Sequence, residues 1–264
     1  MDNVKQRNRV EVCYSPSQYH LYDPENFEIV VVIDVLRATS AITTALHFGV
    51  AKIIPLETID EAIVSRENGV ITAAEREGKV VEGFEFGNSP IAFMQRRLEG
   101  ETVALTTTNG TKAIRVAQNR PYVVMGCLNN LDVMSHWLVH MNKNVLLLAS
   151  GWKEKYNLED TICGGAIAEA LLETGRYECQ EDSTISAKFI YRSARENLWS
   201  FLKASSHRRR LKNLNIQEDV RYCLQPNTVH CIPILKDGAI VKLPYIAEEL
   251  DSARHNPNNM RIEL

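Results

Sequence analysis

The feature that most constrains the fold of this chain is a repeated alternation between short apolar runs and helix-forming segments. The run Glu28 to Val35 contains five consecutive β-branched apolar residues, which is typical of a strand covered on both faces. An amphipathic stretch from Ala38 to Phe48 follows, and Gly49 is a typical residue at the C-terminal end of a helix. Strands that alternate with helices in this way predict a parallel sheet covered by helices.

The same alternation continues to about residue 175. Thr58 and Glu61 have the spacing of a capping box, and Ser89-Pro90 is a typical start for a helix that reaches about Leu98. We therefore predict an α/β fold, a three-layer α/β/α arrangement around a mostly parallel or mixed sheet. The further segments that we predict are strands at 51–56, 70–74, 102–106, 122–126 and 144–149, and helices at 111–118 and 131–141.

Beyond Gly175 the chain is more charged and its pattern is less regular. Helical structure is expected from Ser183 to Lys203, and two late strands are expected near Val229–Ile234 and Ala239–Lys242. These segments predict a C-terminal part that contains both helices and strands.

Two domain assignments are open. We assign residues 1–175 to an α/β core that carries the main motifs and residues 176–264 to a C-terminal α+β subdomain, and one continuous domain is the alternative. The polar tail from Asp251 to Leu264 is expected to be peripheral.

Composition excludes several classes of protein. The 264 residues include 30 Lys plus Arg and 33 Asp plus Glu, so the formal net charge of −3 disfavours binding of nucleic acid through bulk charge. Apolar runs are far shorter than the roughly 20 residues of a membrane-spanning helix, and the N-terminus lacks the apolar core of a signal peptide. We expect a cytoplasmic protein with no membrane partner. The six cysteines lack the spacing of a zinc site and are expected to be reduced, buried thiols.

Polar residues follow several of the predicted strands at the points where these strands end. Asp34 follows the first strand, Glu75-Arg76 the third, Thr106–Thr111 the fourth and Ser150-Gly151 the sixth. Ligands of open α/β sheets bind outside the carboxyl ends of the strands. The sequence therefore predicts a polar site at this edge of the sheet.

The segment Thr106–Thr111 contains three successive threonines, an Asn-Gly turn and Thr111, which is expected to cap a helix. Backbone N–H groups, hydroxyls and a helix N-terminus would then point at one place, as in phosphate sites. The alternative is a turn whose threonines bind only local backbone groups, and this segment alone does not separate the two.

Asp34 emerges from an apolar strand and needs a cation. Arg37 could supply it as an ion pair, or a divalent metal such as Mg²⁺ could bind there, and the sequence does not separate these alternatives. Glu159-Asp160 could complete a metal site, although favourable negative charge at a helix N-terminus is the more common role of such a pair. The basic run His207–Arg210 could bind an anionic substrate, although most such runs are a solvated face.

Taken together and in order, several segments resemble the signature segments of the ComB family of 2-phosphosulfolactate phosphatases. The resemblance runs from about residue 28 to residue 234, and the segments 205–211 and 218–223 are similar to the family's His-containing C-terminal part. The matching segments are Val32–Ser40, Glu75-Arg76-x-Gly78, Gly83-Phe84-x-Phe86-Gly87-Asn88-Ser89-Pro90, Thr106–Thr111 and Glu159-Asp160-x-x-Cys163.

The resemblance implies a Mg²⁺-dependent phosphatase that hydrolyses 2-phospho-3-sulfolactate to sulfolactate and phosphate, a step of coenzyme M biosynthesis. This small phosphoester carries carboxylate, sulfonate and phosphate groups. Three anionic groups would explain why arginines such as Arg37 and Arg76 gather near one site. A homo-oligomer is possible, although Trp137 and Trp199 are expected to belong to the core.

Our mechanistic hypothesis is metal-assisted phosphoryl transfer to water, with a covalent phosphate on Asp34 as the main rival. A phosphate-binding regulatory protein and a phosphotransfer enzyme are the alternative functions. Asp34, Arg37 and Glu75 are the predicted catalytic residues, and Asp34, Glu75 and Asp160 the predicted metal ligands. The predicted substrate-binding residues are Thr39, Ser40, Arg76, Asn88, Ser89, Thr107, Thr108, Asn109, Gly110, Thr111, Gly151, His207 and Arg209.

Overall fold

The structure is a computed structural model that describes residues 7–211, 214 and 216–244. Its strands form one sheet in the order β5-β4-β6-β3-β11-β10-β7-β2-β8-β1-β9. The strands are β1 (Asn8–Cys13), β2 (Ile29–Ile33), β3 (Lys52–Leu56), β4 (Ile71–Arg76), β5 (Lys79–Val80), β6 (Thr102–Thr106), β7 (Tyr122–Gly126), β8 (Val145–Ala149), β9 (Tyr177–Glu178), β10 (Pro233–Lys236) and β11 (Ala239–Lys242).

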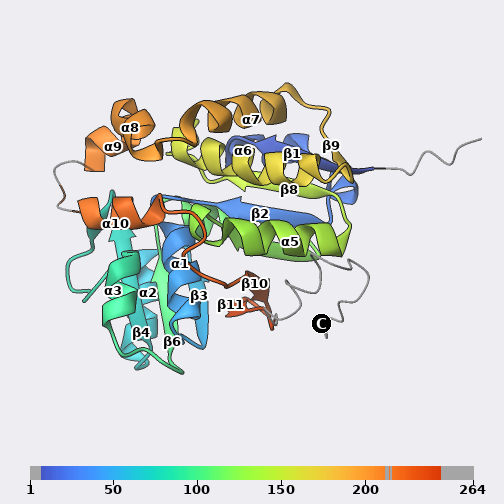
Figure 1. Cartoon of the computed structure of the whole chain (residues 1–264). Coiled ribbons are helices and arrows are strands. Elements are labelled where there is room, and N and C mark those ends of the chain that lie inside the picture. Colours follow the sequence, from blue (N-terminus) through green and yellow to red (C-terminus); the bar gives the residue numbers. More distant parts are fainter. Residues whose placement is uncertain (1–6, 212–213, 215, 245–264) are drawn as a thin grey trace, which may run out of the picture.

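Helices cover both faces of this sheet (Figure 1). The α-helices are α1 (Ala38–His47), α2 (Ile59–Glu67), α3 (Pro90–Gln95), α4 (Gly110–Ala117), α5 (Leu131–Met141), α6 (Leu158–Glu173), α7 (Asp182–Ala194), α8 (Leu198–Phe201), α9 (Ser206–Leu211) and α10 (Gln217–Cys223). The predicted α/β class, its three layers and its mixed sheet are confirmed.

The sheet consists of two parallel sets of strands joined by a hairpin. One set contains β4, β6 and β3, and the other contains β7, β2, β8, β1 and β9. The antiparallel hairpin β10–β11 lies between the two sets, where Ile234 pairs with Val124 and Ile240 pairs with Ile53. The two sets are steeply inclined to each other in Figure 1. The late strands of the chain therefore join the two halves of the sheet.

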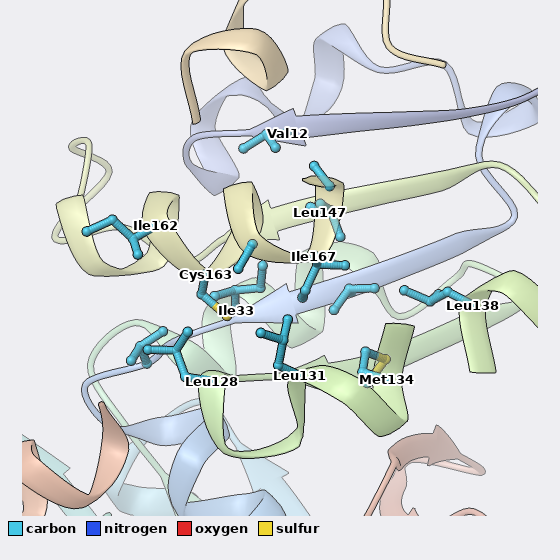
Figure 2. Close-up of a cluster of buried hydrophobic side chains, with 14 of the residues drawn as sticks. Val12, Ile33, Leu128, Leu131, Met134, Leu138, Leu147, Ile162, Cys163 and Ile167 are labelled. Atoms are coloured by element: carbon cyan, nitrogen blue, oxygen red, sulfur yellow. The ribbon is translucent and has the colours of Figure 1, made fainter. Parts of the chain in front are cut away.

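Strand β2 shows why a continuous β-branched run predicts a central strand. Ile29, Val31 and Ile33 pack into one hydrophobic cluster, whereas Val30 and Val32 pack into a second cluster on the opposite face. Figure 2 shows the first cluster, in which side chains of α5 and α6 meet those of the sheet. Because β2 is fully buried, its packing fixes the position of Asp34, which follows the strand.

The predicted helix starts are largely confirmed. Thr58 and Glu61 form the capping box of α2, and the Ser89 hydroxyl accepts a hydrogen bond from the Ala92 N–H at the start of α3. Thr111 was predicted to cap a helix. This prediction is wrong, because α4 already begins at Gly110. The predicted helix near Thr161 also begins earlier, at Leu158.

The sequence did not predict strand β1, although this strand pairs with β8 in the interior of the sheet. The division of the chain near residue 175 stays a prediction, and chain segments from both sides of it contribute strands to the sheet. The predicted tail lies outside the described residues. Among the helices that the structure describes, none is long and apolar enough to cross a bilayer.

Candidate active site

A small cavity lies where the chain leaves β2, β4 and β6. Most of its lining comes from segments that the sequence singled out, together with residues of α9 and of the loop after β8. The lining residues are Asp34, Leu36, Arg37, Glu75, Gly78, Asn88, Asn109, Trp152 and His207. The structure therefore brings together six of the predicted site residues: Asp34, Arg37, Glu75, Asn88, Asn109 and His207.

Asp34 lies directly after β2 and is only 7% exposed. Its Oδ1 atom accepts a hydrogen bond of 3.3 Å from the Ala38 N–H, at the start of α1. Burial is the main cause that raises the pKa of Asp34 to about 6, and Glu75 raises it further, whereas His207 opposes the shift. The ionised form of Asp34 is thus disfavoured mainly by burial.

Gly110 allows α4 to approach this carboxylate. A Cβ atom at this position would lie 2.4 Å from the Ala38 Cβ and 2.8 Å from the Asp34 Oδ2. Only glycine therefore fits between the starts of α1 and α4, and the positive end of the α4 dipole faces Asp34.

Glu75 is held by the threonine segment. Its carboxylate accepts hydrogen bonds from the Thr108 N–H at 3.2 Å and from the Thr108 hydroxyl at 3.2 Å, and it also accepts one from the Gly78 N–H. Glu75 is 5% exposed. The Thr108 donors that were predicted to bind phosphate are therefore engaged with a carboxylate.

Thr107 and Thr111 bind each other rather than the cavity. The Thr107 hydroxyl accepts from the Thr111 N–H at 3.2 Å, and the Thr111 hydroxyl donates to the Thr107 carbonyl oxygen at 3.1 Å. Local hydrogen bonding, which was the alternative for this segment, accounts for both hydroxyls. Asn109 is the member of the threonine segment that lines the cavity.

Arg37 is paired with a residue that the sequence did not connect to it. Its Nη1 atom donates to Asp219 on α10, and its Nη2 atom donates to the Gly78 carbonyl oxygen at 3.0 Å. Asp34, which was the expected partner of an ion pair, does not take this role. The ion pair with Arg37 was one of two alternatives for Asp34, and the contacts of Arg37 with Asp219 and Gly78 do not support it.

His207 enters the cavity from α9. Its Nδ1 atom is hydrogen-bonded to Glu159 at the start of α6, and its ring lies 5.3 Å from that of Trp152. Glu159 is 1% exposed, so the pair is almost completely buried. Arg209 is exposed, and its guanidinium donates to the Ala204 carbonyl oxygen. His207 thus belongs to the cavity, whereas Arg209 points elsewhere.

Asp160 lies behind the cavity rather than in its lining. Its Oδ1 atom accepts from the Val35 N–H at 2.9 Å, and its Oδ2 atom accepts from Ser150 and Gly151 at 3.2 Å each. Burial, followed by the charges of Asp34 and Glu159, raises the pKa of Asp160 well above its usual value. Its contacts fix the turn after β2 against the loop after β8.

Four other predicted residues have their polar groups engaged outside the cavity. The Thr39 hydroxyl binds backbone oxygens of Asp34 and Gly126, and the Ser40 hydroxyl binds the Val35 oxygen. Arg76 donates to the Thr106 hydroxyl at 2.9 Å. The Ser89 hydroxyl donates to Asp219 at 2.6 Å. These groups stabilise the turns and the helix starts around the cavity.

The side-chain oxygen atoms at the cavity are of the kind that binds a hard divalent cation. Asp34 and Glu75 line the cavity, and the buried Asn88 Oδ1 atom has no hydrogen-bond partner among the residues that the structure describes. Within the described residues, no three Asp, Glu, His or Cys side chains form a metal-binding group. Mg²⁺ requires fewer, because one or two carboxylates with water and phosphate oxygens usually hold it. The fit therefore involves Asp34, Glu75 and Asn88 rather than Asp160.

Sequence reasoning missed Trp152 and Asp219 as residues of this site. Trp152 comes from a segment whose spacing carries no chemical pattern, and the place of both residues depends on how the loop after β8 and helix α10 pack. The resemblance of segment 218–223 to the family's C-terminal part was the available signal for Asp219.

Comparison with known proteins identifies the family of this chain. A family model described as 2-phosphosulpholactate phosphatase matches residues 13–238. The chain belongs to the 2-phosphosulfolactate phosphatase family. Membership of this family makes it an enzyme of the phosphoric monoester hydrolase class.

Relatives of the 2-phosphosulfolactate phosphatase family cover most of the chain. A probable 2-phosphosulfolactate phosphatase of Caldanaerobacter subterraneus subsp. tengcongensis is 35% identical over 215 residues, which cover 80% of this chain and 89% of the relative. Proteins with the same description from Cyanothece sp. and Synechocystis sp. are 34% and 37% identical over 242 and 209 residues. These matches cover 88% and 77% of this chain, and 98% and 87% of the two relatives.

Proposed function

We propose that this enzyme hydrolyses the phosphate monoester of a small 2-phospho acid, with 2-phosphosulfolactate as the first candidate and Mg²⁺ as the cofactor. The observation that supports it best is the convergence of Asp34, Glu75, Arg37 and His207 on one small cavity. The names of the relatives supply the candidate substrate. The two carboxylates that line the cavity, Asp34 and Glu75, are the reason to propose a bound cation.

Asp34 and Glu75, with the Asn88 carbonyl oxygen, would hold the Mg²⁺ ion. When bound, the ion would supply positive charge to the phosphoryl oxygens of the substrate. The two basic side chains of the cavity already have acidic partners, Arg37 with Asp219 and His207 with Glu159. A multiply anionic substrate therefore needs positive charge beyond what these side chains provide.

The side chains of the cavity have distinct roles in the proposed reaction. Arg37 and the N-terminal end of α4 orient the phosphoryl group and stabilise its charge in the transition state. Glu159 holds His207 through Nδ1, so Nε2 is the nitrogen that can give a proton to the leaving oxygen. Trp152 packs beside the His207 ring and helps to fix its orientation.

The attacking group is either water or the Asp34 carboxylate. Water attack gives phosphate directly, whereas attack by Asp34 forms an acyl phosphate that water then cleaves. Rapid-quench experiments with labelled substrate separate the two routes. Stoichiometric acid-stable label on the protein, absent from Asp34→Asn, would contradict the direct attack of water that we propose.

The test of the function is phosphate release from a panel of 2-phospho acids with Mg²⁺ or with EDTA. We expect release from 2-phosphosulfolactate that stops in EDTA and returns when Mg²⁺ is added in excess. If no ester releases phosphate, hydrolysis is wrong, and a phosphate-binding role takes its place. If release continues in EDTA, hydrolysis is supported, and the proposed dependence on Mg²⁺ is wrong.

A further inference from the structure

We propose that Asp219 is a positioning residue for Arg37 and that it fixes the guanidinium that faces the phosphoryl group. The inference rests on the proposed function, because that function places Arg37 at the transferred group. Asp219 itself does not line the small cavity that contains Asp34. Its effect on the cavity passes through its contact with Arg37.

Asp219 is built into the structure by three elements. It lies on α10, which packs against α3, and it is 5% exposed (Figure 1). Its Oδ2 atom accepts from Arg37, whereas its Oδ1 atom accepts from the Ser89 hydroxyl at 2.6 Å and from the Ile91 N–H at 3.4 Å. The carboxylate thus connects the start of α1 to the start of α3.

Arg37 needs such a partner because its charge is buried. It is 5% exposed, and its second Nη atom donates to the Gly78 carbonyl oxygen at 3.0 Å. An unpaired guanidinium in this place would be costly, since a buried charge must be paired and hydrogen-bonded. With Asp219 on one Nη atom and Gly78 on the other, the planar group has one defined orientation.

The position of Arg37 between two hollows explains why this orientation matters. Arg37 and Gly78 line both the cavity of Asp34 and a larger neighbouring hollow, which Asp219 also lines. Without Asp219, the Arg37 Nη1 atom loses its partner, and the flexible side chain can take other orientations. Asp219 and the Gly78 carbonyl oxygen therefore hold the guanidinium at the boundary between the two hollows, where it still lines the cavity of Asp34.

Asp219→Asn tests this role with little change in shape. The amide keeps an acceptor for Ser89 and removes the charge that holds Arg37. We expect kcat/KM for phosphate release to fall roughly ten- to hundredfold, mainly through kcat, because a small misplacement of a transition-state contact has this effect. Asp219→Glu, which keeps the charge, should recover part of the loss. Asp237→Asn, the same chemical change in the exposed turn of the β10–β11 hairpin, is the matched control and should retain wild-type kinetics.

A double-mutant cycle separates positioning from general stabilisation. In an Arg37→Gln background, Asp219→Asn should change kcat/KM by less than about twofold, because its effect requires Arg37. A full, additive loss in that background would overturn the proposal. Unchanged kinetics of Asp219→Asn in the otherwise native chain would also overturn it.

A spectroscopic measurement keeps the inference testable independently of the substrate. The Arg37 side-chain N–H signals in ¹H–¹⁵N spectra, assigned by their loss in Arg37→Gln, should show slow guanidinium rotation in the native chain and fast rotation in Asp219→Asn. Equal rotation in both proteins would refute positioning. If no phosphoester were hydrolysed, the proposed function would fail, and this measurement would still decide the role of Asp219.

Discussion

At the scale of single residues, the site places carboxylates where the fold would be more stable without their charge. Asp34 is the clearest case, because burial raises its pKa from 3.8 to about 6. The folded protein therefore binds this proton more tightly than the unfolded chain does. The ionised form lowers the stability of the fold as pH rises from about 4 to about 6.

Asp34→Asn should consequently separate stability from activity. With EDTA present at pH 8, we expect a free energy of unfolding higher than that of the native chain by on the order of 2–3 kcal/mol, because each pKa unit corresponds to about 1.4 kcal/mol. The difference should shrink below about pH 4, where Asp34 is protonated in both states. Urea denaturation at a series of pH values measures it.

The same variant should lose at least about a hundredfold in kcat/KM with Mg²⁺ present. Asp237→Asn, in the exposed turn of the β10–β11 hairpin, is the matched control and should change neither stability nor activity. A stability difference that grows at low pH would contradict the raised pKa. Full activity of Asp34→Asn would remove Asp34 from the reaction.

The sequence predicted which side chains gather at the cavity better than it predicted the role of each side chain. Asp34, Glu75 and Asn109 were predicted from their place after strands, because parallel strands bring their carboxyl ends to one edge. The hydroxyls of Thr39, Ser40 and Thr107 were predicted at the substrate, yet they satisfy nearby backbone groups. Whether a threonine binds a ligand or its own turn depends on backbone geometry, which composition does not encode.

At the scale of elements, two neighbouring glycines of α6 have different surroundings. A Cβ atom on Gly165 would lie 2.1 Å from the Ala187 carbonyl oxygen of α7, whereas one on Gly164 would make ordinary contacts of 3.5 Å with Val12. The close approach of α7 to α6 therefore depends on Gly165. A glycine pair within a predicted helix gives no information about which neighbour comes close.

Gly165→Ala should destabilise the protein by about 1–3 kcal/mol, because α7 has to move away from α6. Gly164→Ala is the matched control, and it should be neutral or stabilising by up to about 1 kcal/mol through helix propensity. Denaturant midpoints of the two variants at one pH provide the comparison. Equal effects of the two substitutions would show that the helices are not held this closely.

At the scale of the whole molecule, the β10–β11 hairpin determines whether the chain behaves as one unit. It is the connection between the two parallel sets of strands, and Ile240 at its centre is fully buried opposite Ile53. The sequence predicted two late strands but assigned them to a separate part of the chain. Insertion into a sheet depends on contacts that are distant in sequence, and local patterns do not contain them.

Ile240→Ala should lower the free energy of unfolding by about 2–4 kcal/mol, whereas Val241→Ala, on the half-buried side of the strand, should have a smaller effect. Unfolding followed by tryptophan fluorescence and by circular dichroism should still coincide. Trp137 and Trp199 pack with the cluster on the β1–β2–β8 side, so fluorescence reports mainly that half. Two separated transitions would indicate two independent folding units.

The central place of the hairpin has a consequence for synthesis of the protein on the ribosome. Strands β3 and β7 emerge early, yet their partners β11 and β10 follow only after most of the chain has been made. Until then, each nascent half exposes an unpaired strand edge, which is a site for association with other chains. Nascent chains that stop before residue 233 should therefore depend on chaperones more than the finished protein does.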